Sequence, residues 1–298
     1  MDQNNDVLLR FLLPTAGVRG AIVRLGASWR ELASHGAPDP ASARLLGEAC
    51  AAAALLSGHV KVEGRLSIQL RGGPIATLFA EATVAGTLRG IVRLRDGATA
   101  PTSNLTALGE DALLAITVEN PSPGGRDPSR YQGLVTPQAA RLDQVLETYF
   151  SQSEQLPTRL HLACDNAAAA GLLLQKLPGG EDDADGFRRA SILLATLRED
   201  ELLALPPREV VRRLFHEEAP DLLGEASLRF GCSCSRERVA DVLLALGRAE
   251  ADAAVAAGTG TATIGCEFCG RTYRFDAGAI AELFARHASA LPGAPGVQ

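Results

Sequence analysis

A run of short, strand-like stretches follows residue 64. Residues 65–71 and 111–119 alternate apolar and polar side chains, apolar and small residues continue through 75–84, and residues 86–94 resemble a further strand. Period-two alternation is typical of a β-strand with one buried face. Consecutive strands joined by local turns, such as Gly72-Gly73-Pro74, favour antiparallel pairing, because parallel strands need longer crossovers. The pattern therefore predicts a largely antiparallel sheet.

Helical periodicity appears in two stretches of the same region. Residues 41–56 are rich in alanine and carry apolar side chains at three- and four-residue spacing, and residues 139–150 repeat this spacing with larger side chains. Helices combined with an antiparallel sheet define the α+β class. The chain is therefore predicted to be an α+β protein that begins with an N-terminal α/β domain containing a largely antiparallel sheet.

Two cysteines fall on the apolar faces of predicted elements. Cys50 lies in the alanine-rich helix, and Cys164 aligns with the leucines of a strand predicted at residues 159–164. Free cysteine behaves as a small hydrophobic side chain, so we expect both to be buried packing residues. His161 falls on the opposite face of the same strand, where we expect it to be solvated.

A polar segment near residue 180 marks a change in organisation. Residues 178–186 contain three glycines and four acidic residues, a composition typical of a linker. The helices predicted after it are short and are interrupted by Pro206-Pro207, so their stability should depend on neighbouring elements. If they pack on the C-terminal part of the chain, loosening of that part would release them. The predicted division is an N-terminal α/β domain at 1–178, an acidic linker with a helical middle region at 179–224, and a small C-terminal domain at 225–298.

The composition narrows the classes of partner. The chain has 298 residues and a formal charge of −6. Proteins that bind nucleic acid usually carry a basic field, so the acidic balance argues against a nucleic-acid partner. No apolar run approaches the roughly 18 residues of a membrane span, and the polar N-terminus lacks the pattern of a secretory signal. We expect a cytoplasmic protein without a membrane partner.

Four of the six cysteines form two close pairs near the C-terminal end. Cys232 and Cys234 belong to a Gly-Cys-Ser-Cys-Ser motif, and Cys266 and Cys269 to a Gly-Cys-Glu-Phe-Cys-Gly motif. In a cytoplasmic protein such pairs are more often metal ligands or redox groups than structural disulfides. Zn²⁺ accepts four thiolates in a tetrahedron, and a domain this small commonly needs a metal to fold. The spacing predicts one Zn²⁺ per chain, bound by these four cysteines.

The cysteine pattern alone is compatible with several functions. The zinc could be a purely structural ion, or the thiolates could form a redox switch, because oxidants attack thiolates. The nearby Arg236 and Arg238 could favour the thiolate form of the cysteines. A catalytic zinc keeps an open position, which disfavours an enzyme, and we expect His216 and His287 to lie outside the site. A thiol oxidoreductase normally carries its Cys-x-x-Cys at the start of a helix in a βαβ unit. Residues 225–298 contain seven arginines and eight acidic residues, which disfavours a nucleic-acid-binding zinc ribbon but leaves a structural zinc-ribbon adaptor open.

Longer motifs extend the pattern beyond the cysteines. The stretch Cys-Ser-Cys-Ser-Arg-Glu-Arg begins at residue 232, and Cys-Glu-Phe-Cys-Gly begins at residue 266. Other distinctive segments, in chain order, are Val18-Arg19-Gly20, Arg130-Tyr131-Gln132-Gly133, residues 149–159 (Tyr-Phe-Ser-Gln-Ser-Glu-Gln-Leu-Pro-Thr-Arg) and residues 214–218 (Leu-Phe-His-Glu-Glu). Together they resemble the signatures of the 33 kDa chaperonin (heat shock protein 33) family over most of the chain.

This resemblance implies a cytosolic, redox-regulated holdase chaperone rather than an enzyme. The reduced, zinc-bound protein would be inactive. Oxidants would release the zinc, form the disulfides Cys232–Cys234 and Cys266–Cys269, and expose apolar surface that holds unfolding client proteins without ATP. The oxidised form would be a homodimer. The implied fold is an N-terminal α/β domain, a helical middle region and a small zinc-binding C-terminal domain.

Overall fold

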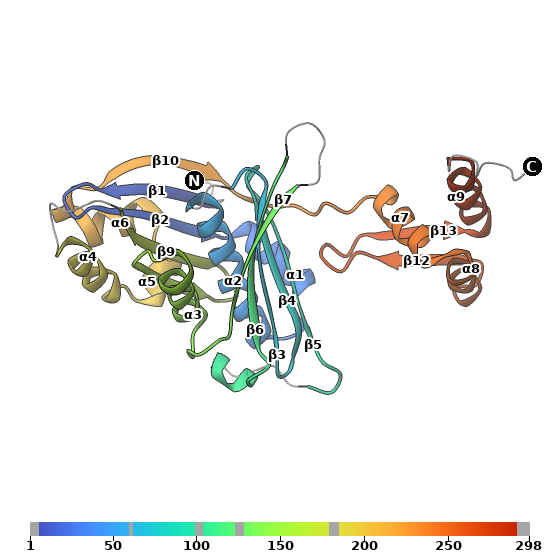
Figure 1. Ribbon diagram of the computed structural model, residues 1–298, viewed down its shortest axis with the longest axis horizontal. Coiled ribbons are helices and arrows are strands. Elements are labelled where there is room, and N and C mark those ends of the chain that lie inside the picture. Colours follow the sequence, from blue (N-terminus) through green and yellow to red (C-terminus); the bar gives the residue numbers. More distant parts are fainter. Residues whose placement is uncertain (1–5, 60–61, 99–103, 123–127, 179–184, 291–298) are drawn as a thin grey trace, which may run out of the picture. The chain divides into compact units, whose positions relative to one another are not determined.

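The chain folds into two compact units, residues 1–231 and residues 232–298. The computed structural model describes residues 6–59, 62–98, 104–122, 128–178 and 185–290. Its mixture of helices and antiparallel strands confirms the predicted α+β class (Figure 1). The predicted boundaries at residues 178 and 224 stay a prediction, and residues 179–184 of the predicted linker lie outside the described part of the chain.

The first unit contains a five-stranded antiparallel sheet. Its strand order is β10-β1-β2-β9-β8, and each neighbouring pair runs antiparallel. The strands are β1 (Val7–Leu13), β2 (Val18–Leu25), β8 (Thr158–Cys164), β9 (Ala169–Lys176) and β10 (Asp221–Ser227). The pairing of β10 with β1 thus joins segments from opposite ends of this unit.

A second sheet of six strands has the order β11-β5-β4-β3-β6-β7. Five of its strands pair antiparallel, as the alternating pattern predicts, and only β11 pairs in parallel, with β5. The strands are β3 (Arg65–Gly72), β4 (Ile75–Thr83), β5 (Thr87–Leu94), β6 (Leu113–Asn120), β7 (Ser129–Val135) and β11 (Arg229–Phe230). The last strand at one edge of this sheet is therefore β7.

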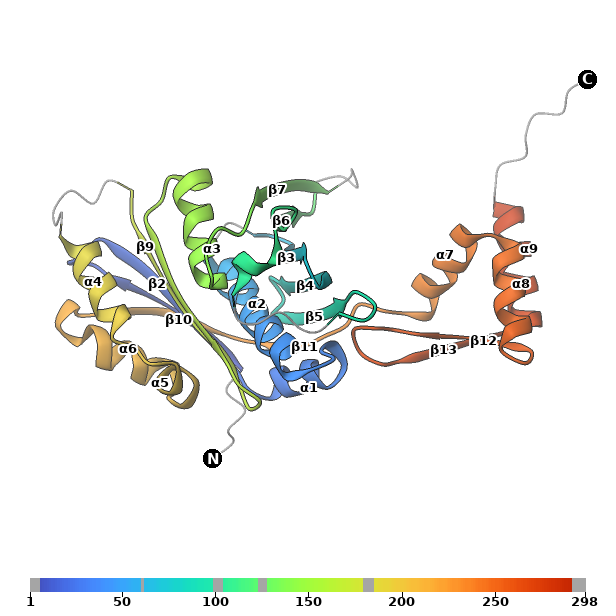
Figure 2. The same ribbon diagram turned by 90° about the horizontal axis from the view of Figure 1, so that it is seen from below.

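Helix α2 (Pro40–His59) lies between the two sheets and contacts strands of both (Figure 2). Its alanine-rich sequence explains this position, because small side chains let a helix approach two sheets closely. The approach to β5 is close at Cys50 of the helix, since a Cβ added at Gly90 on β5 would lie 3.0 Å from the Cys50 sulfur. None of the described helices, α2 included, is long and apolar enough to cross a bilayer. The other helical segments before residue 160 are α1 (Ala27–Gly36), η1 (Leu105–Leu108), α3 (Leu142–Tyr149) and the π-helical turn η3 (Phe150–Glu154).

Three short helices cover the other face of the five-stranded sheet (Figure 2). They are α4 (Gly186–Ala195), α5 (Glu199–Ala204) and α6 (Pro207–Phe215), followed by the turn η4 (His216–Glu218). The ring of Phe215 stacks on Phe11 of β1 with 5.7 Å between centroids. These short helices bury their apolar faces against this sheet. Their dependence on a neighbouring element for stability stays a prediction.

Strand β8 corrects one expectation. Cys164 is buried, as predicted, but His161 is only partly exposed, and its Nε2 is buried without a hydrogen-bond partner among the described residues. The reason is that helices contact β8 from both sides, so the face that carries His161 is partly covered, although Arg159 on the same face is exposed. Burial, followed by the positive charge of Arg141, lowers the pKa of His161.

The second unit has a small core around a two-stranded antiparallel sheet. Its elements are α7 (Arg236–Leu246), α8 (Arg248–Ala257), β12 (Thr261–Gly265), β13 (Thr272–Asp276) and α9 (Ala277–Ala290). The Ser235 hydroxyl accepts a hydrogen bond from the Arg238 amide at 3.2 Å and caps α7. Seven buried apolar residues form the core: Leu243, Ala251, Val255, Ala262, Tyr273, Phe275 and Ile280. A core of this size leaves the unit dependent on a further constraint.

Candidate metal centre

Two loops of the second unit carry the four paired cysteines. Cys232 and Cys234 lie in the extended segment that leads into α7, whereas Cys266 and Cys269 lie in the turn between β12 and β13. That turn is closed by two backbone hydrogen bonds of 2.8 Å, from the Cys266 amide to the Arg271 carbonyl and from the Gly270 amide to the Cys266 carbonyl. Gly270 has a φ of 68°, which explains the glycine after the second cysteine.

The four sulfur atoms form one cluster. All Sγ atoms lie within 4.8 Å of one another, with 3.6 Å between Cys232 and Cys266 and 3.4 Å between Cys234 and Cys269. Four thiolates at 2.3 Å from a tetrahedral Zn²⁺ would be separated by about 3.8 Å. The spacing and the soft, all-sulfur donor set therefore fit a structural zinc ion.

Tyr273 is a contact of the cluster that the sequence did not reveal. Its hydroxyl donates a hydrogen bond to the sulfur of Cys234 at 3.1 Å. Burial raises the pKa of Cys232 to about 12 and also raises that of Cys269. Burial acts in the same direction on Cys234, but the hydrogen bonds from Tyr273 and from neighbouring cysteines outweigh it and lower its pKa to about 7. Cys234 is thus ionised more readily than Cys232 or Cys269.

The arginines near the cluster act differently from the sequence expectation. The guanidinium of Arg236 lies 4.1 Å from the ring centroid of Phe275 and donates a hydrogen bond to the Arg274 carbonyl. Arg238 donates to the carbonyl and hydroxyl oxygens of Ser233. The arginine that interacts with the sulfurs is Arg271, whose pKa is raised by a hydrogen bond with Tyr273 and by the charges of Tyr273, Cys234 and Cys269. The sequence could have indicated this arginine, because Arg271 lies only two residues after Cys269.

The remaining cysteines and the two candidate histidines lie elsewhere. Cys50 and Cys164 are buried in the first unit, where burial raises the pKa of Cys50 to about 12. His216 directly follows α6, and His287 lies exposed on α9. Within the described residues, the four paired cysteines are the one group whose ligand atoms come close enough to hold a metal ion.

Known proteins resemble this chain along nearly its whole length. A sequence model of the Hsp33 protein family matches residues 6–276. The chain is 42% identical to the 33 kDa chaperonin of Ectopseudomonas mendocina over 295 residues, covering 97% of this chain and 98% of the relative. It is also 42% identical to the 33 kDa chaperonin of Azotobacter vinelandii, with the same coverage.

A solved structure shares the fold. The crystal structure of the 33 kDa chaperonin (heat shock protein 33 homolog) from Thermotoga maritima superimposes with a TM-score of 0.77 and covers 96% of this chain and 99% of its own. At 21% sequence identity, this likeness concerns the fold alone. The match to the family model and the 42% identity to two curated relatives show that the chain belongs to the Hsp33 family.

Proposed function

We propose that this protein is a redox-regulated holdase chaperone that works without ATP and is not an enzyme. It acts in the cytoplasm, binds unfolding client proteins rather than nucleic acid or membranes, and forms a homodimer when oxidised. The observation that carries the proposal is the gathering of Cys232, Cys234, Cys266 and Cys269 into one four-sulfur cluster in a unit with a small core. Membership of the Hsp33 family supports the chaperone assignment.

In the reduced state these four cysteines would hold one Zn²⁺ as thiolates. Bound there, the ion would cross-link the segment before α7 to the β12–β13 turn. Because a site of this kind does not exist in an unfolded chain, the free energy of binding stabilises the folded unit. The reduced protein is the inactive form.

Oxidation changes the bonding partners of the sulfurs. A thiolate attacks hydrogen peroxide, which breaks the O–O bond and gives a sulfenic acid and hydroxide. The neighbouring thiolate then attacks this sulfur, forms the disulfide and releases a second hydroxide, so one peroxide takes up the two electrons of each disulfide. The proposed pairs are Cys232–Cys234 and Cys266–Cys269. Sulfurs in disulfides no longer serve as thiolate ligands, so the four cysteines would no longer hold the zinc.

The surface that holds clients is proposed to come from loosening of the helical middle region. Helices α4, α5 and α6 cover one face of the five-stranded sheet, where Phe11, Ile22 and Leu174 are fully or almost fully buried. Departure of these short helices would expose a broad apolar area. Such a surface would bind the apolar segments that unfolding proteins expose.

The test compares aggregation of a chemically unfolded client, followed by light scattering, with reduced and peroxide-treated protein in the absence of nucleotide. We expect suppression only after peroxide. Replacement of Cys232 or Cys266 by serine should weaken zinc binding and abolish the dependence on peroxide. Cys50→Ala is the matched control because this thiol lies in the core of the first unit. Equal redox dependence in all variants would argue against the proposed site.

A further inference from the structure

Two of the distinctive sequence segments meet at the edge of the six-stranded sheet. Arg130-Tyr131-Gln132-Gly133 lies on β7, and the segment that starts at Tyr149 forms the end of α3 and the π-helical turn η3. A Cβ added at Gly133 would lie 2.4 Å from the Tyr149 ring, so this contact requires glycine. The turn ends at Gln155, whose φ of 54° is unusual for a residue with a side chain. Single π-turns of this kind occur frequently at functional sites.

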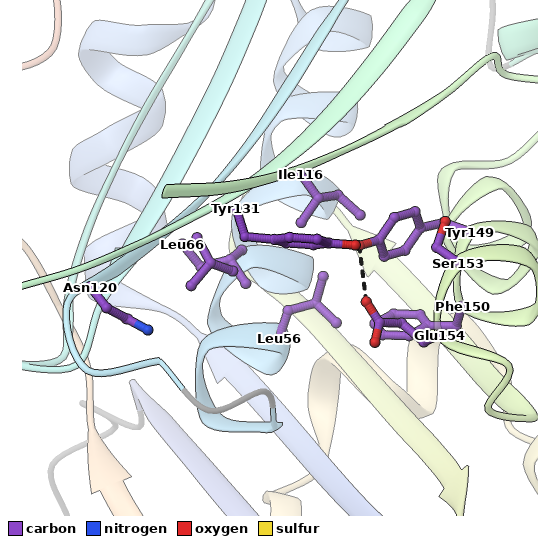
Figure 3. A pocket seen from close by; sticks show the side chains of 10 residues that line it. Leu56, Leu66, Ile116, Asn120, Tyr131, Tyr149, Phe150, Ser153 and Glu154 are labelled. Carbon is purple, nitrogen blue, oxygen red and sulfur yellow. Dashed lines mark hydrogen bonds between the residues drawn. The ribbon is translucent and has the colours of Figure 1, made fainter. Parts of the chain in front are cut away.

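The two segments enclose a pocket of about 350 Å³ (Figure 3). Its size falls within the ~300–1,000 Å³ typical of ligand pockets. Its base is formed by Leu56 of α2, Leu66 of β3 and Ile116 of β6, which are buried, and its accessible apolar lining includes the partly exposed Val118 of β6 and the exposed ring of Tyr131. The pocket therefore accepts an apolar side chain.

The rim of the pocket is polar and acidic. Tyr131 is 52% exposed although it is one of only three tyrosines in the chain, and Ser153 and Glu154 are also exposed. Glu154 accepts a hydrogen bond from the Tyr149 hydroxyl at 3.3 Å and is the one charged side chain among the described residues that line the pocket (Figure 3). A carboxylate beside aromatic rings favours a cation. The rim thus complements a positive charge placed next to an apolar group.

The pocket also adjoins an open sheet edge. Strand β7 is the last strand of its sheet, and no other described strand pairs with its outer side. Residues 131 and 133 share the face toward Tyr149, since alternate residues of a strand point the same way. Extended peptides bind at such edges by adding a strand, with side-chain pockets beside the edge selecting the sequence.

We propose that this pocket docks an extended segment of an unfolded protein in which an apolar side chain stands next to a lysine or arginine. The apolar side chain covers the partly exposed Val118 beside the exposed ring of Tyr131, and the cation faces Glu154. This inference rests on the proposed holdase function and names a binding subsite for its clients. The residues that line the pocket all belong to the first unit.

The test uses a fluorescein-labelled, unstructured seven-residue peptide with a central leucine between two lysines, and measures its anisotropy with the full-length protein in both redox states. Two matched peptides replace the leucine by serine or both lysines by glutamate. We expect either change to weaken binding about tenfold or more. On the protein, Ser153→Leu should fill the pocket and cause a similar loss, whereas Ser151→Leu, which places the same side chain on an exposed position of the same turn outside the pocket, should leave affinity within about twofold.

A second variant addresses the charge. Glu154→Gln keeps an acceptor for Tyr149 and should lower the affinity for the lysine peptide about threefold to tenfold while leaving the affinity for a peptide with serine in place of lysine unchanged. Equal binding of the lysine and glutamate peptides, or unchanged binding to Ser153→Leu, would overturn the inference. A loss of self-association in Ser153→Leu without any peptide binding to the wild type would also overturn it, in favour of a second copy as the occupant.

The same samples separate this inference from the proposed function. If the oxidised wild type suppresses client aggregation while Ser153→Leu binds the peptide normally, the docking site is wrong and the holdase function stands. If the peptide binds as expected but neither redox state suppresses aggregation, the docking site stands and the holdase function is wrong.

Discussion

The Tyr273 hydroxyl donates a hydrogen bond to the sulfur of Cys234 across 3.1 Å. The ring of Tyr273 belongs to the core of the second unit, and the residue lies on β13, paired with Ile264 of β12. The strand that closes the core thus also orients a donor toward one of the four sulfurs. Tyr273 therefore contributes both to the packing of the second unit, through its ring, and to the environment of the Cys234 sulfur, through its hydroxyl.

Removal of this donor should weaken metal binding. Tyr273→Phe keeps the packed ring and loses only the hydroxyl, and loss of a partner that orients a metal ligand typically reduces affinity about tenfold or more. Competition for zinc against a chromogenic chelator measures the effect. Tyr131→Phe is the matched control, because this tyrosine lies in the first unit. Equal zinc affinity in both variants would remove Tyr273 from the site.

The disulfide pairing is open to a direct test, because the cluster geometry does not select it. Trypsin cleaves after Arg229, Arg236 and Arg271, so Cys232 and Cys234 fall in one peptide and Cys266 and Cys269 in another. The proposed pairing predicts that each peptide loses the mass of two hydrogen atoms after peroxide treatment. The contradicting result is a cross-linked species that joins the two peptides, as expected if Cys232 pairs with Cys266.

Glu48 on α2 should make the stability of the first unit depend on pH. Burial raises its pKa from the usual 4.5 to about 7, despite the opposing effect of Arg44. A raised carboxyl pKa means that the folded state favours the protonated form, so the stabilisation is fully present below about pH 4.5 and is lost as the pH rises to about 7. Glu48→Gln removes this dependence.

The difference in unfolding free energy between Glu48→Gln and the wild type should therefore grow in favour of the variant by about 2–3 kcal/mol between pH 5 and pH 8. Urea unfolding followed by fluorescence measures it, since Trp29 is the single tryptophan of the chain and is buried in the first unit. Glu31→Gln, at an exposed position, is the control. A difference that stays constant with pH would refute the raised pKa.

Phe215 should hold the helical middle region on the sheet. Its ring is fully buried and stacks on Phe11, so Phe215→Ala should destabilise this contact by roughly 3–5 kcal/mol. Hydrogen exchange followed by mass spectrometry should then speed up in α4, α5 and α6 more than in α2. Arg212→Ala on the exposed side of α6 serves as control. Uniform acceleration across the first unit would show that the helices do not loosen separately.

Much of the fold followed from local patterns. The helix predicted at residues 41–56 corresponds to α2, and the alternating stretches at 65–71 and 111–119 correspond to β3 and β6. These predictions succeeded because the period of apolar side chains matches the geometry of each element. The cluster of four cysteines followed from spacing in the same way.

Other features depend on contacts that no local pattern encodes. His161 was placed on a solvated face because alternation assumes that one side of a strand is exposed to water, whereas helices contact β8 from both sides and leave His161 only partly exposed. Gly247, with a φ of 94°, separates α7 from α8 without a strong stop signal in the sequence. The hydrogen bond from Tyr273 to Cys234 joins residues 39 positions apart and arises only from the pairing of β12 with β13.

The most direct test of the redox switch measures zinc release and client aggregation in one sample. Peroxide is added to the reduced, zinc-loaded protein without nucleotide, zinc release is recorded with a chromogenic chelator, and portions are mixed with an unfolding client to measure light scattering. The account predicts that suppression of scattering appears in step with zinc release and disappears when a thiol reductant and zinc are restored. A protein that suppresses scattering equally well before peroxide, or that releases its zinc and never suppresses scattering, would contradict it.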